Sequence, residues 1–230
     1  MNAPKSPFGF LLAAADKANA VAPHHSVWRS VRIGMLGFGG ASLLVFGSWA
    51  WIGGWLFTQL GEAGTYSVWA ATFIAVAGVA LRGLMQVPVS MPRFLGFFLT
   101  AFGTYALVWS VVWFTARNHL GEWFASLLGT LGLSMILCWG FRSWSMLPRV
   151  ALGLFVLHSA GYFGGGLLYA WVLGKSFPPD LLGQAARSDL SKLMWGIGYG
   201  CGFGAGLGYA FNAVQQPPRQ EANCPDAPVV

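Results

Sequence analysis

Six apolar stretches, each about as long as a bilayer is thick, occupy residues 31–214 and contain almost no charge. Roughly 20 apolar residues in a helix cross the hydrocarbon core of a membrane, because a helix rises about 1.5 Å per residue. Charge is costly to bury in hydrocarbon, and nearly all charges here lie between or outside the stretches. The sequence therefore predicts an all-α, multi-pass membrane protein. Its six transmembrane helices are expected at residues 33–57, 64–81, 94–114, 123–141, 150–174 and 193–214.

The composition argues against an ordinary soluble domain and against a nucleic-acid-binding protein. Apolar residues make up 56% of the chain and charged residues 9%, against about 25% charged in an ordinary soluble domain. The net charge of +6 comes from basic residues that are scattered singly between apolar runs. They form no stripe that could follow phosphates, so no nucleic-acid partner is expected. The lipid bilayer is the expected environment, and the basic residues are topology signals.

Lysine and arginine are distributed unequally between the two sides of the predicted membrane. Nine lie on the side that carries both termini, and four lie on the other side. Because basic loops stay in the cytoplasm, both termini are expected there, and the cytoplasmic (inner) membrane of a bacterium is the expected location. The nine are Lys5, Lys17, Arg29, Arg32, Arg82, Arg93, Arg142, Arg149 and Arg219, and the four are Arg117, Lys175, Arg187 and Lys192.

The charge and apolar patterns divide the chain into three parts. Residues 1–30 form a cytoplasmic N-terminal arm, in which the apolar run 8–15 is expected to lie as a helix in the headgroup layer. Residues 31–214 form the transmembrane domain of six helices. Residues 215–230 are rich in Pro, Gln, Asn and Asp and are expected to be a disordered cytoplasmic tail.

Every second residue between positions 196 and 208 is glycine. At about 100° per residue, a helix divides these glycines into two stripes on nearly opposite faces. Small residues let transmembrane helices approach closely, so we expect a glycine-rich, tightly packed bundle in which this helix packs between two glycine-bearing neighbours. A moving or pore-lining helix is the alternative. The stripes are Gly196, Gly200, Gly204 and Gly208 on one face, and Gly198, Gly202 and Gly206 on the other.

Polar side chains inside the predicted helices are mostly hydroxyls, and no Asp, Glu, Lys or Arg lies near a helix centre. His158 is the only imidazole expected inside a helix. It is interpreted either as a neutral, hydrogen-bonded residue or as an active group. A membrane haem normally needs two axial imidazoles, so neither a cofactor nor a metal is expected. The possible intramembrane polar site comprises Ser134, His158, Tyr162 and Asn212, and no catalytic residue is assigned.

Two short strings resemble parts of the rhomboid proteases. His158-Ser159-Ala160-Gly161 with Gly165 is similar to the histidine helix of that family, and Gly132-Leu133-Ser134 is similar to its serine helix. Met135 occupies the position where the family has glycine, and the two helices are consecutive here although the family inserts another between them. The resemblance covers two of the predicted helices and implies an intramembrane hydrolase that acts through Ser134.

Three functions are therefore compared. Few polar side chains are expected at the centre of the bilayer, which favours a non-catalytic subunit or scaffold of a larger membrane complex. The partners expected for the chain in general are the lipid bilayer and either other membrane subunits or further copies of this chain. The alternative is a transporter or channel for a small solute, which would use backbone carbonyls and hydroxyls as ligands. The third is a membrane hydrolase or a lipid-modifying enzyme. Acidic residues that could approach headgroups are Glu62, Glu122, Asp180 and Asp189.

Overall fold

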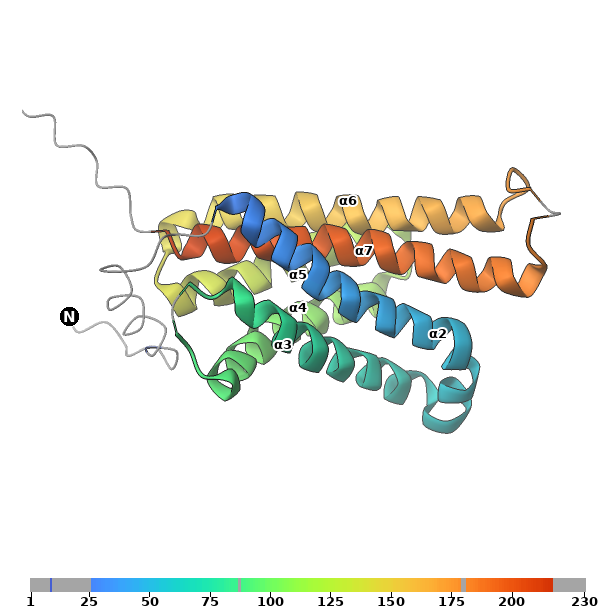
Figure 1. Ribbon diagram of the computed structural model, residues 1–230, viewed down its shortest axis with the longest axis horizontal. Helices are drawn as coiled ribbons and strands as arrows, with labels where there is room; N and C mark the ends of the chain where they lie inside the picture. Colours follow the sequence, from blue (N-terminus) through green and yellow to red (C-terminus); the bar gives the residue numbers. More distant parts are fainter. Residues whose placement is uncertain (1–8, 10–25, 87, 179–180, 217–230) are drawn as a thin grey trace, which may run out of the picture.

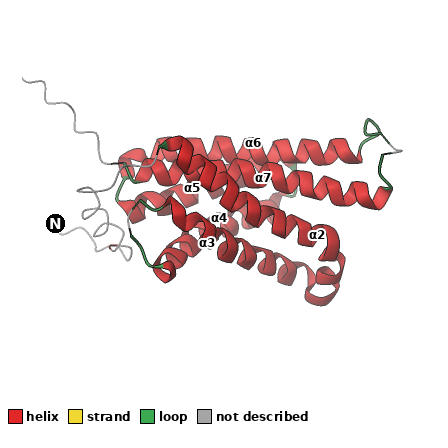
Figure 2. Cartoon of the chain, in the orientation of Figure 1, coloured by secondary structure: helices red, strands yellow, loops and turns green. Residues whose placement is uncertain are grey.

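The computed structural model describes residues 9, 26–86, 88–178 and 181–216. Within this part the chain is 89% helical and has no strands (Figure 2). The main helices are α2 (Val27–Thr72), α3 (Gly78–Leu81), α4 (Met91–Ala116), α5 (His119–Phe141), α6 (Leu147–Leu173) and α7 (Gln184–Val214). The shorter elements are the π-helix η1 (Phe73–Ala77) and the 3₁₀-helices η2 (Arg82–Leu84) and η3 (Trp144–Met146).

The expected headgroup helix of the N-terminal arm lies outside the described residues, apart from residue 9. The expected disordered tail also lies outside them, apart from residues 215–216. Helix α2 begins at Val27, inside the range assigned to the arm, because the Ser26 hydroxyl caps it by accepting a hydrogen bond of 3.2 Å from the Arg29 amide.

The helix α2 contains a reversal of the chain at Gly61 (Figure 1). This residue has φ 65° and ψ −176°, a conformation that is essentially restricted to glycine because it has no Cβ atom. Two antiparallel arms result, and the second continues through η1 and α3 to the end of η2 at Leu84. The reversal falls between the first two apolar stretches of the sequence.

Local signals define most other helix ends. Pro92 and Pro148 occupy the first turns of α4 and α6, where a missing amide hydrogen does no harm. The Asn118 side chain caps α5 by accepting a hydrogen bond of 2.8 Å from the Gly121 amide. Arg117 and Arg142 end α4 and α5 in the left-handed conformation, with φ 47° and 50°. The short turns between α4, α5 and α6 follow from these ends.

The start of α7 differs from the prediction. The helix begins at Gln184, whereas the sequence places its start at residue 193. The Arg187 guanidinium donates hydrogen bonds to the Val172 carbonyl at 2.8 and 3.1 Å and to the Gly174 carbonyl at 2.8 Å. These bonds hold the polar first turns of α7 against the end of α6. Hydropathy marks only the apolar part of this helix, so it misses the extension.

Four helical segments of the described chain are long and apolar enough to cross a membrane. They are Val27–Leu84, which includes the reversal at Gly61, Met91–Ala116, His119–Phe141 and Trp144–Leu173. The helix α7 is not among them, because its glycines contribute no apolar side chain. This architecture is consistent with a helical membrane protein.

The helix α7 lies between the first arm of α2 and α6, and α4 packs against α5 (Figure 1). Where α2, α4 and α7 meet, phenylalanine rings form the centre of the core. Phe38 contacts Phe203 with ring centroids 5.0 Å apart, and Phe102 contacts both. Further buried rings continue this core from Phe102: Phe94, Phe97, Phe98, Phe141 and Phe211.

The two ends of the bundle differ in charge. One end carries six arginines and no acidic residue among the described residues. It includes Val27, residues 82–86 and 88–90, residues 142–146 and Val214. The opposite end has four basic and three acidic described residues. We call the first the arginine end; its members are Arg29, Arg32, Arg82, Arg93, Arg142 and Arg149.

Candidate functional site

The glycines of α7 bring two helices close to its backbone. Their two stripes face different neighbours, and a Cβ atom on most of them would overlap the facing helix. Toward α2, Gly196 faces Phe46, Gly200 faces Gly39 and Ser42, Gly204 faces Gly34, and Gly208 faces Ser30. Toward α6, Gly198 faces Gly161 and Gly165, Gly202 faces Leu157 and Gly161, and Gly206 faces Leu154 and Leu157.

Two side-chain hydrogen bonds add to the contact between α2 and α7. The buried Ser42 hydroxyl donates to the Gly196 carbonyl at 2.7 Å. The Asn212 amide donates to the Ser30 hydroxyl at 3.3 Å. Asn212 therefore lies at the arginine end, nine residues beyond Phe203.

His158 lies on α6 in the interior of the bundle, with no exposed surface. Its Nε2 atom shares a hydrogen bond of 2.7 Å with the Tyr105 hydroxyl of α4. From α7, the Phe203 ring lies edge-on to the imidazole with centroids 4.9 Å apart, and the Tyr199 ring lies edge-on at 5.8 Å. The close approach of α6 and α7 puts these rings in contact, so the glycine contacts also position the imidazole.

Two further tyrosines extend the cluster. The Tyr199 ring lies edge-on to that of Tyr162, with centroids 6.3 Å apart. The Tyr162 ring lies one turn along α6 from His158 and nearly parallel to it, with centroids 5.9 Å apart and an interplanar angle of 13°. We call His158, Tyr105, Tyr162 and Tyr199 the histidine–tyrosine cluster. It draws its members from α4, α6 and α7.

A row of polar groups connects this cluster to the surface. The Tyr162 hydroxyl donates to the Glu122 carboxylate at 3.4 Å. The second carboxylate oxygen lies 3.0 Å from His119 Nδ1, and the His119 side chain is 99% exposed. His119 and Glu122 lie in the first turn of α5, at the end opposite the arginine end. The hydrogen bonds therefore lead from the surface to Tyr162, and the stacked rings of Tyr162 and His158 continue from there into the interior.

The cluster also has unused hydrogen-bonding capacity. Among the described residues, buried polar atoms without a hydrogen-bond partner include His158 Nδ1 and the Ser159 hydroxyl on α6. On the neighbouring helices they include Trp109 Nε1 and the Ser126 hydroxyl. The Trp109 ring lies 5.9 Å from that of Tyr162. Buried polar groups usually have a hydrogen-bond partner. A buried imidazole nitrogen without one is therefore a position at which a hydrogen-bond donor or acceptor could bind.

Ser134 has a different environment. Its hydroxyl donates to the Thr130 carbonyl of the same helix at 2.7 Å. Serine commonly bonds in this way within a helix and needs no outside partner. The described residues include no hydrogen bond between Ser134 and His158, which a serine nucleophile and its base would require. Of the four residues in the predicted polar site, the structure brings together His158 and Tyr162 and places Ser134 and Asn212 in other hydrogen bonds.

The sequence interpretation missed the partners of His158. Tyr105 and Tyr199 were only two hydroxyl-bearing residues within apolar stretches, and no spacing on their own helices relates them to His158. Glu122 carried a weak signal, since it follows His119 by three residues in a first helical turn, where a carboxylate is favoured. Only the packing of α5 against α6 shows that it also meets Tyr162.

The described residues contain no group of three or more His, Cys, Asp or Glu side chains that could hold a metal ion. Cys138 and Cys201 are free thiols. The fold and this cluster define the class as a helical protein with apolar helices suited to a membrane and a buried histidine–tyrosine cluster. No protein-family model, curated protein or solved structure matches the chain.

Proposed function

We propose that this chain is a non-catalytic subunit or scaffold of a larger membrane complex. The observation that carries the proposal is the contact of α7 with backbone on both of its faces. A Cβ atom at Gly204 would overlap the Gly34 carbonyl of α2. On the other face, a Cβ atom at Gly198 would lie 2.6 Å from the Gly165 Cα atom of α6.

Such contacts favour a static bundle over a moving one. A helix that slides along its neighbour must move its larger side chains past those of the other helix. Because the backbones of α7 and its neighbours already touch, the helices would first have to separate. The fully buried rings of Phe38 and Phe203 fill the space between α2 and α7. A rigid bundle of this kind suits a protein that holds other subunits in place.

The proposal includes a topology of six membrane crossings within a glycine-packed bundle. The reversal at Gly61 divides Val27–Leu84 into two arms, and α4, α5 and α6 add three crossings. The helix α7 supplies the sixth, since 31 residues are more than enough to cross a bilayer. Both termini lie in the cytoplasm beneath the inner membrane, because the arginine end then faces the side on which basic residues collect.

The test is extraction of the tagged full-length chain in a mild detergent, followed by native mass spectrometry. We expect other membrane proteins to accompany it in fixed stoichiometry. Gly164→Leu is a suitable control, because nothing lies within 4 Å of a Cβ atom at that position, so the variant should keep the same partners. Recovery of the chain only as a monomer or homo-oligomer would contradict the proposal.

The polar row from His119 to His158 favours a second candidate, a transporter of a small solute or of protons. A transport path needs polar groups that continue from one surface into the interior, and this row does so from one side. The test is flux across proteoliposomes by the purified chain. Transport that is lost in Tyr162→Phe and His158→Leu but kept in Tyr169→Phe would support this candidate. Flux equal to that of empty liposomes would reject it.

A further inference from the structure

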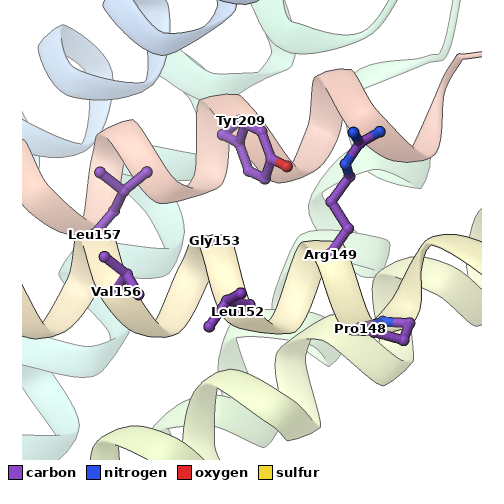
Figure 3. Close-up of a pocket in the computed structure, with 7 residues that line it drawn as sticks. All are labelled: Pro148, Arg149, Leu152, Gly153, Val156, Leu157 and Tyr209. Atoms are coloured by element: carbon purple, nitrogen blue, oxygen red, sulfur yellow. The ribbon is translucent and has the colours of Figure 1, made fainter.

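An open groove of about 580 Å³ lies along α6 and α7 near the arginine end. Figure 3 shows the Tyr209 ring of α7 over Gly153 of α6, with the Arg149 side chain extending from α6 toward α7. A Cβ atom at Gly153 would lie 2.7 Å from the Cδ1 atom of this ring, so glycine is needed for the ring to lie there. The groove is lined by Pro148, Arg149, Leu152, Gly153, Val156, Leu157 and Tyr209.

The lining has two chemically different parts. Along α6 it is apolar, and Leu152 and Val156 are 64% and 50% exposed. At one end it presents the Arg149 guanidinium and the Tyr209 hydroxyl (Figure 3). Neither group has a hydrogen bond or an ion pair within the described part of the chain. A cation and a hydroxyl donor therefore lie beside exposed apolar side chains on the outer face of the bundle.

The positive charge at this end of the groove favours binding of an anion. The arginine end contains no acidic side chain among the described residues, so none of them is available to pair with Arg149. Guanidinium groups bind phosphates through paired, charge-assisted hydrogen bonds. In a membrane protein, cations at a helix end lie at the level of the lipid headgroups and attract anionic lipids.

We propose that this groove binds an anionic phospholipid. The Arg149 guanidinium and the Tyr209 hydroxyl hold the headgroup phosphate, and an acyl chain lies along Leu152 and Val156. A soluble anion would use only the polar end, whereas a phospholipid uses both parts at once. The site requires that the chain lies in a bilayer and is independent of its role as a subunit or transporter.

The test measures lipid retention by the full-length chain. The purified protein is titrated in detergent with phosphatidylglycerol or with phosphatidylcholine of the same acyl chains, and bound lipid is counted by native mass spectrometry. We expect one phosphatidylglycerol to bind in preference to phosphatidylcholine. Arg149→Gln should weaken its binding about tenfold, since a charge-assisted hydrogen bond is lost, and Tyr209→Phe should weaken it several-fold. Both side chains are at least partly exposed, so the variants should fold.

Arg32→Gln is the matched control, because it removes an exposed arginine from the same end but outside the groove. It should retain phosphatidylglycerol as the parent does. Val156→Trp fills the apolar part while leaving the charge unchanged, and it should also weaken retention. Equal loss in Arg149→Gln and Arg32→Gln would overturn the site in favour of general charge attraction. Equal binding of the two lipids, or unchanged binding in Val156→Trp, would overturn it as well.

Discussion

Gly204 of α7 lies so close to Gly34 of α2 that a Cβ atom at either position would overlap the backbone carbonyl of the other. Neither helix can tolerate a side chain there unless the pair separates. The separation would also affect the opposite face of α7, where Gly202 lies against Gly161 of α6. The three helices therefore depend on one another at glycine positions.

Gly204→Leu and Gly202→Leu should each destabilise the fold by about 3 kcal/mol or more, because overpacking at a backbone contact forces helices apart. The measurement is unfolding in mixed micelles with increasing sodium dodecyl sulfate, followed by circular dichroism. Gly40→Ala is the control on α2, since nothing lies within 4 Å of its Cβ position. Parent-like unfolding of both leucine variants would show that these contacts are unimportant.

Gly61→Ala should destabilise the hairpin of the two α2 arms by about 1–3 kcal/mol, because alanine cannot adopt φ 65° with ψ −176° without strain. The same unfolding titration measures the change. Gly54→Ala is the matched control in the first arm of α2. Nothing lies within 4 Å of the added Cβ atom there, and alanine is the better helix former. If the two substitutions had the same effect, the conformation of Gly61 would not be required for the reversal.

Tyr105→Phe should cost about 1–3 kcal/mol, since it leaves the buried His158 Nε2 atom without its partner. Adding His158→Leu to this variant should cost less than it does in the parent, because the bond is already lost. A double-mutant cycle measures this coupling. Tyr169→Phe removes a hydroxyl that has no hydrogen bond among the described residues and should change little. A coupling energy near zero would mean that the bond contributes nothing to stability.

Ser42→Ala should reduce the stability of the fold by about 1 kcal/mol, because its buried hydroxyl donates to the Gly196 carbonyl of a different helix. Ser67→Ala is the comparison within the α2 hairpin. The Ser67 hydroxyl is exposed and bonds to the Ala63 carbonyl of its own helix, so its loss should be nearly neutral. Chemical unfolding of the two variants in parallel tests the difference, and equal effects would contradict the prediction.

Much of the helical architecture follows from the chain alone. The apolar stretches predict helices, and the structure is all helical in its described part, with four segments suited to a membrane. Proline and asparagine near the starts of α4, α5 and α6 indicate where those helices begin. The beginning of α7 was predicted too late, because the polar turn around Arg187 is held by carbonyls at the end of α6 and not by its own hydropathy.

The candidate site was only partly predictable. His158 stood out because it is the single imidazole within an apolar stretch, and Tyr162 lies one turn away on the same helix. Ser134 and Asn212 were grouped with them by polarity alone, which carries no information about distance between helices. Their hydrogen bonds to Thr130 and Ser30 lie elsewhere in the bundle.

The sequence by itself determined which segments are helical and which faces of α7 are smooth, because apolar length and glycine spacing are local properties of the chain. The tertiary structure decided which helices meet those faces and which side chains surround His158. Contacts between α4, α6 and α7 join residues far apart in the sequence, so they depend on how whole helices pack. No local sequence pattern indicates which helices pack together, and the histidine–tyrosine cluster forms only because α4, α6 and α7 do.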